Sequence, residues 1–289
     1  MLHFKNSLTA FLSFSLLYFV IDASQLQAQE ETTTSEPQMI SDPIIRDVNG
    51  NGIIDIIAFG DSITRGVGDF TRTGEDVTEP SRPQGEAGYP LRVENFLHVS
   101  VQNRGVPGEV LFSEGLPRFA LLIPASRPDF VVLSGGTNDA IHFTTDSEYS
   151  RAVQTMLNIA YAVGTVPIIA TVTPVCCEHS GTRPFIESYN NILRGLAHTN
   201  NTDIADISHA YENTCRGEEE CHLLNLPEGE HPNTAGYDVS GEVVTAKFLN
   251  IDIFAPDGPL LLSQAIGVAA TDIKTVPDPI VASSSSPQQ

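Results

Sequence analysis

The 289-residue sequence contains no tryptophan, and its charge is heavily one-sided. It has 15 lysine and arginine residues against 36 aspartate and glutamate residues, which gives a formal net charge of −21 at pH 7. Without tryptophan, an indole platform for stacking sugar rings is excluded. A surface this acidic repels phosphate groups, so we expect neither nucleic acid nor anionic membranes as partners. The charge itself favours solubility.

Long apolar runs are scarce too, and the one near the N-terminus is too short to cross a bilayer comfortably. Residues 8–21 are almost wholly apolar, follow Lys5 and precede Ala23 and Ala28. This is the layout of a secretory signal peptide. We expect residues 1–28 to be a signal peptide and the mature protein to be secreted or periplasmic. An uncleaved N-terminal anchor is the alternative, and no later run approaches the length of a membrane span.

Cysteine is limited to four residues, which lie in two predicted loops: Cys176, Cys177, Cys215 and Cys221. An exported chain meets an oxidising environment that favours disulfides, and four cysteines allow three connectivities. We expect pairing across the two loops, because it would tie the segment before His231 to the loop after a central strand. A zinc site with His179 and His222 is the alternative, but the spacing Cys-Cys-x-His matches no common tetrahedral pattern.

Strand-like apolar runs alternate with helical patterns through most of the chain. Strands are predicted at residues 53–59, 99–103, 130–133, 166–171 and 202–207. Helices are predicted at residues 89–98, 147–163, 187–198 and 235–249. This alternation predicts an α/β fold in which helices cover both faces of a parallel sheet through right-handed crossovers.

The two ends of the chain differ from this central part. Residues 29–46 are polar, with a run of threonines, and are predicted to be a flexible leader. Residues 47–250 form one predicted enzyme domain, since a chain with 41% hydrophobic residues can bury one sizeable core. Residues 251–289 are a C-terminal extension whose serine-rich end we expect to be disordered.

Four short motifs carry the chemistry. The first predicted strand ends in Gly60-Asp61-Ser62, which puts a hydroxyl on a tight turn at the carboxyl edge of the sheet. Three more segments follow at long range: Val-Pro-Gly ending at Gly108, Gly-Gly-Thr-Asn-Asp around Asn138, and Glu-Gly-Glu-His-Pro-Asn around His231. Singly they have ordinary interpretations as a turn glycine, a helix cap and a surface histidine. Together and in this order, the four segments resemble the sequence blocks of the SGNH (GDSL) hydrolase family.

The resemblance covers residues 53–250 and implies a three-layer, flavodoxin-like α/β/α sandwich with a serine nucleophile. Ser62 would be that nucleophile, and His231 the base that takes its proton. The family usually has an aspartate three residues before the histidine, where this chain has Glu228. We expect Glu228 to orient His231, with a backbone carbonyl as the alternative partner. Glu230, adjacent to His231, is expected to point away.

The resemblance also assigns three donors to the oxyanion hole: the backbone N–H groups of Ser62 and Gly108 and the side-chain amide of Asn138. Gly108 lacks a Cβ atom, so its amide can approach a ligand closely. Asn138 would offer a neutral donor at the end of the third predicted strand. One such donor is typically worth about 100- to 1000-fold in turnover.

A second signal precedes the nucleophile. Residues 47–55 match the first half of an EF-hand-like loop, D-x-N-x-N-G-x-x-D, and resemble the calcium loops of FG-GAP-type repeats. The candidate ligands of a structural Ca²⁺ are Asp47, Asn49, Asn51 and Asp55. The loop lacks the glutamate of an EF-hand at its twelfth position, which is Ala58. An Asn-Gly turn that leads into the strand is the alternative.

These features predict a secreted serine ester hydrolase that requires no cofactor and cleaves small acyl esters. Family analogy suggests O-acetyl groups on carbohydrate as the substrate. The alternatives are a lipase or lysophospholipase of the same family, and an exported non-catalytic module that binds through the calcium loop. An α/β-hydrolase is disfavoured, because Ser62 follows the first strand and lacks the Gly-x-Ser-x-Gly context.

Overall fold

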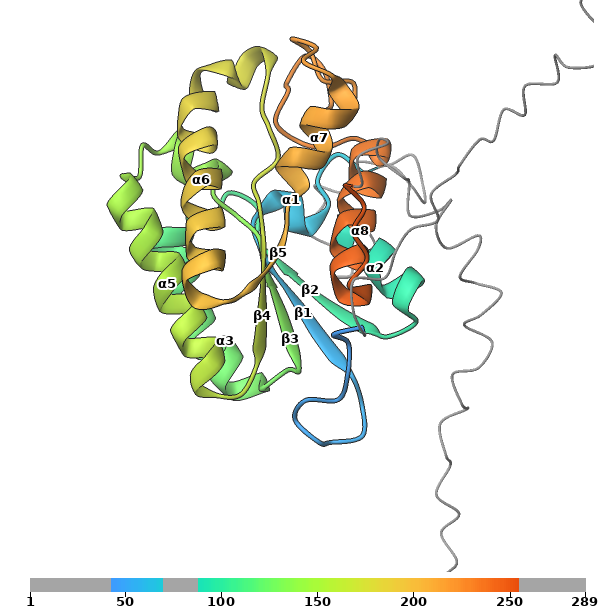
Figure 1. The fold of residues 1–289 in the computed structure, drawn as a ribbon. Coiled ribbons are helices and arrows are strands. Elements are labelled where there is room, and N and C mark those ends of the chain that lie inside the picture. The colour runs from blue at the N-terminus through green and yellow to red at the C-terminus, as the bar shows by residue number, and fades with distance from the viewer. Residues whose placement is uncertain (1–42, 70–87, 255–289) are drawn as a thin grey trace, which may run out of the picture. The chain divides into compact units, whose positions relative to one another are not determined.

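A computed structural model describes residues 43–69 and 88–254, and these form a parallel five-stranded sheet between two layers of helices (Figure 1). The strand order is β2-β1-β3-β4-β5, and every neighbouring pair is parallel. The strands are β1 (Asp55–Gly60), β2 (Ser100–Gly105), β3 (Phe130–Leu133), β4 (Val166–Ala170) and β5 (Asp203–Ala205). This is the flavodoxin-like order of a doubly wound sheet, so the predicted α/β/α sandwich is confirmed.

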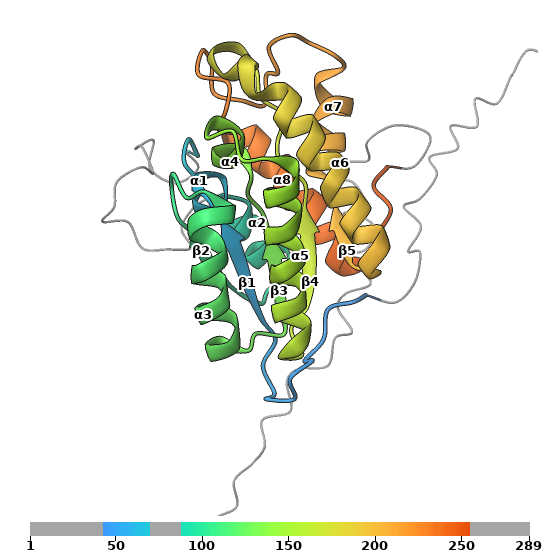
Figure 2. The same cartoon turned by 90° about the vertical axis from the view of Figure 1, so that its left-hand side faces the viewer.

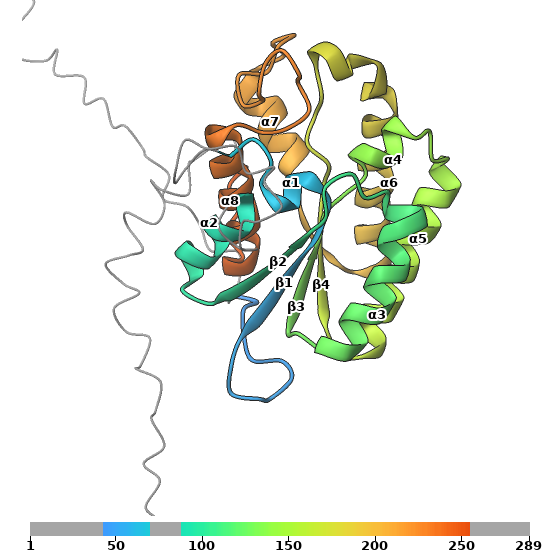
Figure 3. The ribbon, with the colours of Figure 1, turned by 180° about the vertical axis from the view of Figure 1, so that it is seen from behind.

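The central strands β1, β3 and β4 are buried on both faces, which explains why their sequences are nearly continuously apolar. In β1, Ile56 and Ala58 pack into one core cluster, whereas Ile57 and Phe59 pack into the other. The first cluster is covered by α2 (Gly88–Leu97), α7 (Ile207–Cys215) and α8 (Thr234–Leu249). The second is covered by α3 (Leu116–Ser126), α5 (Asp146–Ala162) and α6 (Arg183–Asn200). Figure 2 shows the layer of α3, α5 and α6 in front of the sheet, and Figure 3 shows both layers from behind.

All five predicted strands and all four predicted helices are present, with shifts of a few residues at their ends. Two longer helices were not predicted, α3 and α7. Helix α3 contains Pro117 in its first turn and Pro124 in its interior, so its sequence looks like a loop. Helix α7 begins at Ile207, which the sequence placed at the end of a strand.

The remaining elements are short and lie at the carboxyl edge of the sheet or in the connections near it. They are the α-helices α1 (Ser62–Arg65) and α4 (Thr137–Ile141), the π-helix η2 (Leu111–Gly115) and the 3₁₀-helix η3 (Cys177–Thr182). Helices of four to six residues have no clear apolar period, so sequence patterns do not detect them.

The predicted cross-loop disulfides are wrong in this structure. Cys215 is bonded to Cys221, six residues later, while Cys176 and Cys177 are free thiols. Cys215 is also not in a loop, because it is the last residue of α7. The chain then turns back through Arg216 and Gly217, which both have positive φ, and so returns Cys221 to the end of the same helix.

The predicted signal peptide, residues 1–28, lies outside the described residues, as do most of the leader and of the C-terminal extension. Within the leader, the N–H of Ile44 donates to the carbonyl oxygen of Phe248 in α8 at 2.9 Å. No helix in the described part of the chain combines the length and the apolar character needed to span a membrane. The domain boundaries stay predictions.

Candidate active site

The three loops that carry the first three motifs begin side by side. After the strands end, the N–H of Val106 donates to the carbonyl oxygen of Gly60, and that of Ser134 donates to Phe59, each at 2.9 Å. The chain winds outward in opposite directions from β1 and β3, and the crevice at such a reversal is where doubly wound sheets bind ligands. The segments that follow β1, β2 and β3 hold Ser62, Gly108 and Asn138 respectively, with Ser62 in α1 and Asn138 in α4.

Ser62 is the first residue of α1, on a tightly packed turn. Asp61 caps this helix, because its Oδ1 atom accepts the N–H of Ile63 at 2.9 Å. A Cβ atom on Gly60 would lie 2.1 Å from the carbonyl oxygen of Ser134, so only glycine fits before the turn. The structure therefore explains why a glycine and an aspartate precede Ser62: the first avoids a clash and the second caps α1.

The serine, the histidine and the glutamate are brought into direct contact. His231 Nε2 lies 2.8 Å from Ser62 Oγ. His231 Nδ1 contacts Glu228 Oε1, and the other oxygen of Glu228 accepts the backbone N–H of His231 at 3.1 Å. An ionised carboxylate can only accept, so Nδ1 carries the hydrogen and Nε2 is free to accept the serine proton. This is the tautomer that a general base needs.

Glu228 is charged at neutral pH. Partial burial opposes its ionisation, but hydrogen bonds from the ring and the backbone of His231 outweigh burial and lower the pKa of Glu228. The carboxylate of Glu228 therefore reaches the imidazole despite its extra methylene, and it contacts both the ring and the backbone N–H of His231.

The turn between these residues is supported by the loop after β4. Gly229 has a φ of +75°, and a Cβ atom there would lie 2.5 Å from the carbonyl oxygen of Cys176. The N–H of Cys176 donates to the carbonyl oxygen of Gly229 at 2.8 Å. Glu230 is buried, and its carboxylate contacts His179.

Among the described residues, the three expected oxyanion donors have no competing partners. Within residues 43–69 and 88–254, neither the N–H of Ser62 nor that of Gly108 donates a hydrogen bond. Asn138 is in α4 rather than at the strand end, is buried, and its Nδ2 atom has no partner among the described residues. Glycine is favoured at position 108 because the backbone has a φ of +79°. Space is not the reason, since a Cβ atom there would meet nothing within 4 Å.

Arg118 was missed by the sequence analysis. From α3, its Nε atom donates to Glu109 Oε1 at 2.6 Å, and its Nη atoms donate to the carbonyl oxygens of Arg104 at 3.0 Å and Gly60 at 3.2 Å. One guanidinium thus joins the ends of β1 and β2 to the residue after Gly108. No local pattern marks a single arginine in a proline-containing segment.

Asp139 was also missed, although it directly follows Asn138. Its carboxylate accepts the N–H groups of Leu111 at 2.7 Å and Phe112 at 3.1 Å. It therefore fixes the helix that carries Asn138 against the segment that follows Gly108. Burial is the largest influence on Asp139 and raises its pKa.

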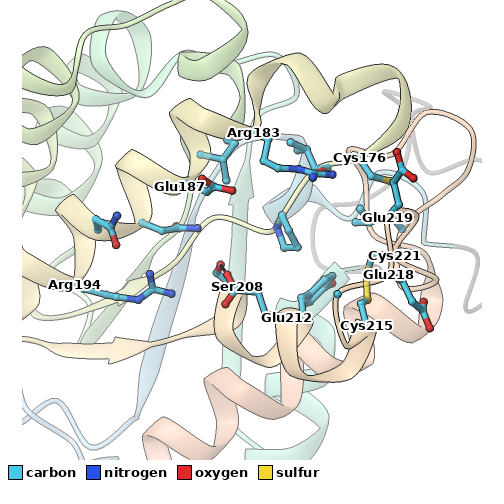
Figure 4. Close-up of a pocket in the computed structure, with 18 residues that line it drawn as sticks. Cys176, Arg183, Glu187, Arg194, Ser208, Glu212, Cys215, Glu218, Glu219 and Cys221 are labelled. Atoms are coloured by element: carbon cyan, nitrogen blue, oxygen red, sulfur yellow. Dashed lines mark hydrogen bonds between the residues drawn. A yellow bond between two sulfur atoms is a disulfide. The ribbon is translucent and has the colours of Figure 1, made fainter.

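A cavity of about 710 Å³ lies elsewhere, between α6 and α7 (Figure 4). Its charged lining includes Arg183, Glu187 and Glu212, and the Cys215–Cys221 disulfide lies at one end. It contains none of the residues expected at the active site, although Cys176 and Leu224 flank the histidine turn. We therefore do not identify this cavity with the active site, which we place at Ser62.

The loop at residues 47–55 is held by its own side chains. Both carboxylate oxygens of Asp47 accept backbone N–H groups, from Gly50 at 2.6 Å and from Gly52 at 2.8 Å. Asn49 and Asn51 each accept the N–H two residues later. Oxygens used in this way close Asx-type turns, which agrees with the alternative of a turn that leads into the strand. The calcium site stays a prediction.

A serine hydroxyl, an imidazole and a carboxylate joined in a row are the arrangement typical of a serine hydrolase. The family model of GDSL-like lipases and acylhydrolases matches residues 58–239. The chain therefore belongs to the GDSL-like lipase/acylhydrolase family, as the sequence motifs indicated, and is a carboxylic ester hydrolase.

Several solved structures share the fold. The lipase/acylhydrolase from Enterococcus faecalis is 22% identical, with a TM-score of 0.55 over 69% of this chain and 98% of that one. The acetylxylan esterase Axe2 from Geobacillus stearothermophilus is 19% identical, with a TM-score of 0.55 over 68% of this chain and 94% of that one. An α/β hydrolase from the metagenome of Lake Arreo is 18% identical, with a TM-score of 0.56 and the same coverage. No curated protein matches the chain.

The carboxyl group of Asp61 should make the stability of the protein depend on pH. Burial raises its pKa from 3.8 to about 6, and its Oδ2 atom has no partner among the described residues. The folded state thus binds the Asp61 proton more tightly than the unfolded state, so stability falls as pH rises from about 4 to about 6. Asp61→Asn keeps the capping oxygen without the charge. Relative to wild type, its free energy of unfolding should gain up to about 3 kcal/mol between pH 4 and pH 7.

Urea denaturation at the two pH values measures this gain. Asp206→Asn is the matched control with the opposite sign. Burial works against ionisation there too, but hydrogen bonds from Arg194 lower the pKa of Asp206. That variant should lose stability at pH 7 and lose less at pH 4. Equal differences between wild type and Asp61→Asn at both pH values would show that Asp61 is not a destabilising charge.

Proposed function

We propose that this protein is a secreted serine esterase in which Ser62, His231 and Glu228 form the catalytic triad. The observation that carries the proposal is the 2.8 Å contact between Ser62 Oγ and His231 Nε2, with Glu228 on the other ring nitrogen. A hydroxyl is a weak nucleophile, and it becomes effective when an adjacent base removes its proton. The predicted N-terminal signal peptide supports secretion or a periplasmic location.

The reaction proceeds in two acyl transfers. Ser62 Oγ attacks the ester carbonyl as its proton passes to His231 Nε2, and the C–O bond to the alcohol breaks as His231 returns that proton to the alkoxide. A water molecule then attacks the acyl-enzyme in the same way, releasing the acid and restoring the serine. Glu228 stabilises the imidazolium in both steps. The negative oxygen that develops on the carbonyl is met by the N–H groups of Ser62 and Gly108 and the amide of Asn138.

The substrate is a small acyl ester, with O-acetyl groups on carbohydrate as the first candidate. Two observations support this choice: the family match, and the fold shared with an acetylxylan esterase. The proposed mechanism uses only side chains and backbone amides of this chain, so it requires no cofactor. Bound Ca²⁺ at residues 47–55 would have only a structural role.

Ser62→Ala tests the proposal against a panel of esters. The panel varies the acyl chain from acetyl to longer acids and includes acetylated xylan and glycerol esters. Wild type should favour short acyl groups, and Ser62→Ala should lose nearly all activity, since the base then has no hydroxyl to activate. A preference for long acyl chains would instead identify a lipase of the same family. Equal activity of the two proteins would remove Ser62 from the mechanism.

Asn138→Ala tests the oxyanion hole. Because the amide is needed most when the carbonyl oxygen becomes negative, kcat should fall by about 100-fold or more while KM changes little. Steady-state kinetics on one acetyl ester measures both constants. An increase in KM with kcat retained would mean that Asn138 only helps to bind the ground state.

Glu228→Gln tests the third member of the triad. The amide keeps the size but loses the charge that stabilises the imidazolium, so kcat should fall by more than about 10-fold. Glu228→Asp restores the residue usual in the family and should retain more activity than Glu228→Gln. Full kcat in Glu228→Gln between pH 6 and 9 would show that Ser62 and His231 act as a dyad.

A further inference from the structure

His179 and Glu230 form a contact beside the histidine turn that the triad does not use. His179 belongs to η3, in the loop after β4, and its Nε2 atom lies 3.1 Å from Glu230 Oε2. Its other ring nitrogen, Nδ1, lies 2.8 Å from the backbone carbonyl oxygen of Glu228. One imidazole therefore bridges the main chain of Glu228 and the side chain of Glu230, on either side of Gly229.

The number of protons in this bridge follows from the groups that face each other. A carbonyl oxygen can only accept, so Nδ1 of His179 must carry a hydrogen. A neutral imidazole has one N–H group, which would leave Nε2 as a lone pair facing a carboxylate oxygen. Two acceptors repel at 3.1 Å, so the contact requires one more proton. That proton is either on Nε2, as an imidazolium beside a carboxylate, or on Glu230, as a carboxylic acid beside a neutral ring.

The charges around the bridge favour retention of this proton. The charged groups that face Glu230 from the neighbouring segments are His231 and Glu228 in its own turn and Asp61 at the end of β1. Burial raises the pKa of Glu230. Loss of the proton would leave a buried, ionised Glu230 near two further carboxyl groups and next to an unprotonated ring nitrogen.

We propose that His179 and Glu230 are a positioning pair that shares one proton and thereby holds the Glu228–His231 turn against Ser62. This inference rests on the proposed function of Ser62 and His231. His179 fixes the carbonyl oxygen of Glu228, the residue whose carboxylate orients the His231 ring. When the pair loses its proton at high pH, the contact between His179 and Glu230 becomes repulsive and the turn loosens. Activity should then decline on the alkaline side.

Kinetics of two variants and one control test this role. His179→Ala removes the bridge and should lower kcat by about 10-fold, with KM changed less than about 2-fold, because only the alignment of the base is disturbed. Glu230→Gln keeps a donor for Nε2 but has no proton to lose, so it should retain kcat at pH 7 and weaken the alkaline decline. His222→Ala is the control, since its imidazole is exposed and paired with Glu218. Wild-type kcat and pH profile in both His179→Ala and Glu230→Gln would overturn the proposal.

A spectroscopic measurement does not depend on catalysis. In protein labelled with ¹⁵N-histidine, long-range ¹H–¹⁵N spectra distinguish the protonated ring nitrogens, and His179→Ala identifies the signals of His179. At pH 7 we expect His179 as an imidazolium or as the Nδ1–H tautomer. A neutral Nε2–H tautomer would contradict the proposal, because Nδ1 could not then donate to Glu228. The measurement itself is made on wild-type protein, and His179→Gln identifies the signals if His179→Ala fails to fold.

The two proposals fail in different ways. If Ser62→Ala is as active as wild type, the proposed function is wrong, while the tautomer of His179 still tests the bridge. If wild type is active through Ser62 but its kcat and pH profile are unaffected by the His179 and Glu230 variants, only the positioning role is wrong.

Discussion

The hydrogen bond between Ser62 Oγ and His231 Nε2 joins residues 169 positions apart in the chain, so it depends on the assembly of the whole sheet. The serine is fixed at the end of β1, whereas the histidine arrives from the turn before α8. Hydrogen bonds from side chains connect these segments, and two of them reach backbone carbonyls after α1. Asn225 Nδ2 donates to the carbonyl oxygen of Gly68 at 3.2 Å, and Tyr237 Oη donates to that of Val67 at 2.7 Å. The geometry of the reacting pair is thus set by packing between β1, α1 and α8 rather than by either loop alone.

The three carboxyl groups near His231 have pKa values that are shifted in different directions. Hydrogen bonds from His231 outweigh burial and lower the pKa of Glu228, whereas burial raises the pKa values of Asp61 and Glu230. Burial therefore lets Asp61 and Glu230 hold a proton to a higher pH than exposed acids would, so negative charge at the site builds up only gradually as pH rises.

The sequence was sufficient for the strands, for α2, α5, α6 and α8, and for the four motifs, because these depend on local patterns. An apolar strand that ends in Gly60-Asp61-Ser62 has few structural alternatives. The contact between Glu228 and His231 was predicted from the family resemblance, which implies an acid three residues before the histidine. Arg118 and His179 could not be found in this way, because each acts on backbone carbonyls of distant segments and lies in no recognisable pattern. The cysteine pairing failed for a related reason: nothing in the sequence shows that α7 extends to Cys215.

The central claim is that Ser62 is the activated nucleophile of this ester hydrolase. The most direct measurement is mass spectrometry of the protein after reaction with a fluorophosphonate, which bonds covalently to activated serines. The account predicts one adduct per chain, on the peptide that contains Ser62, formed in step with the loss of esterase activity. An adduct on a different residue, or loss of activity without modification of Ser62, would contradict it.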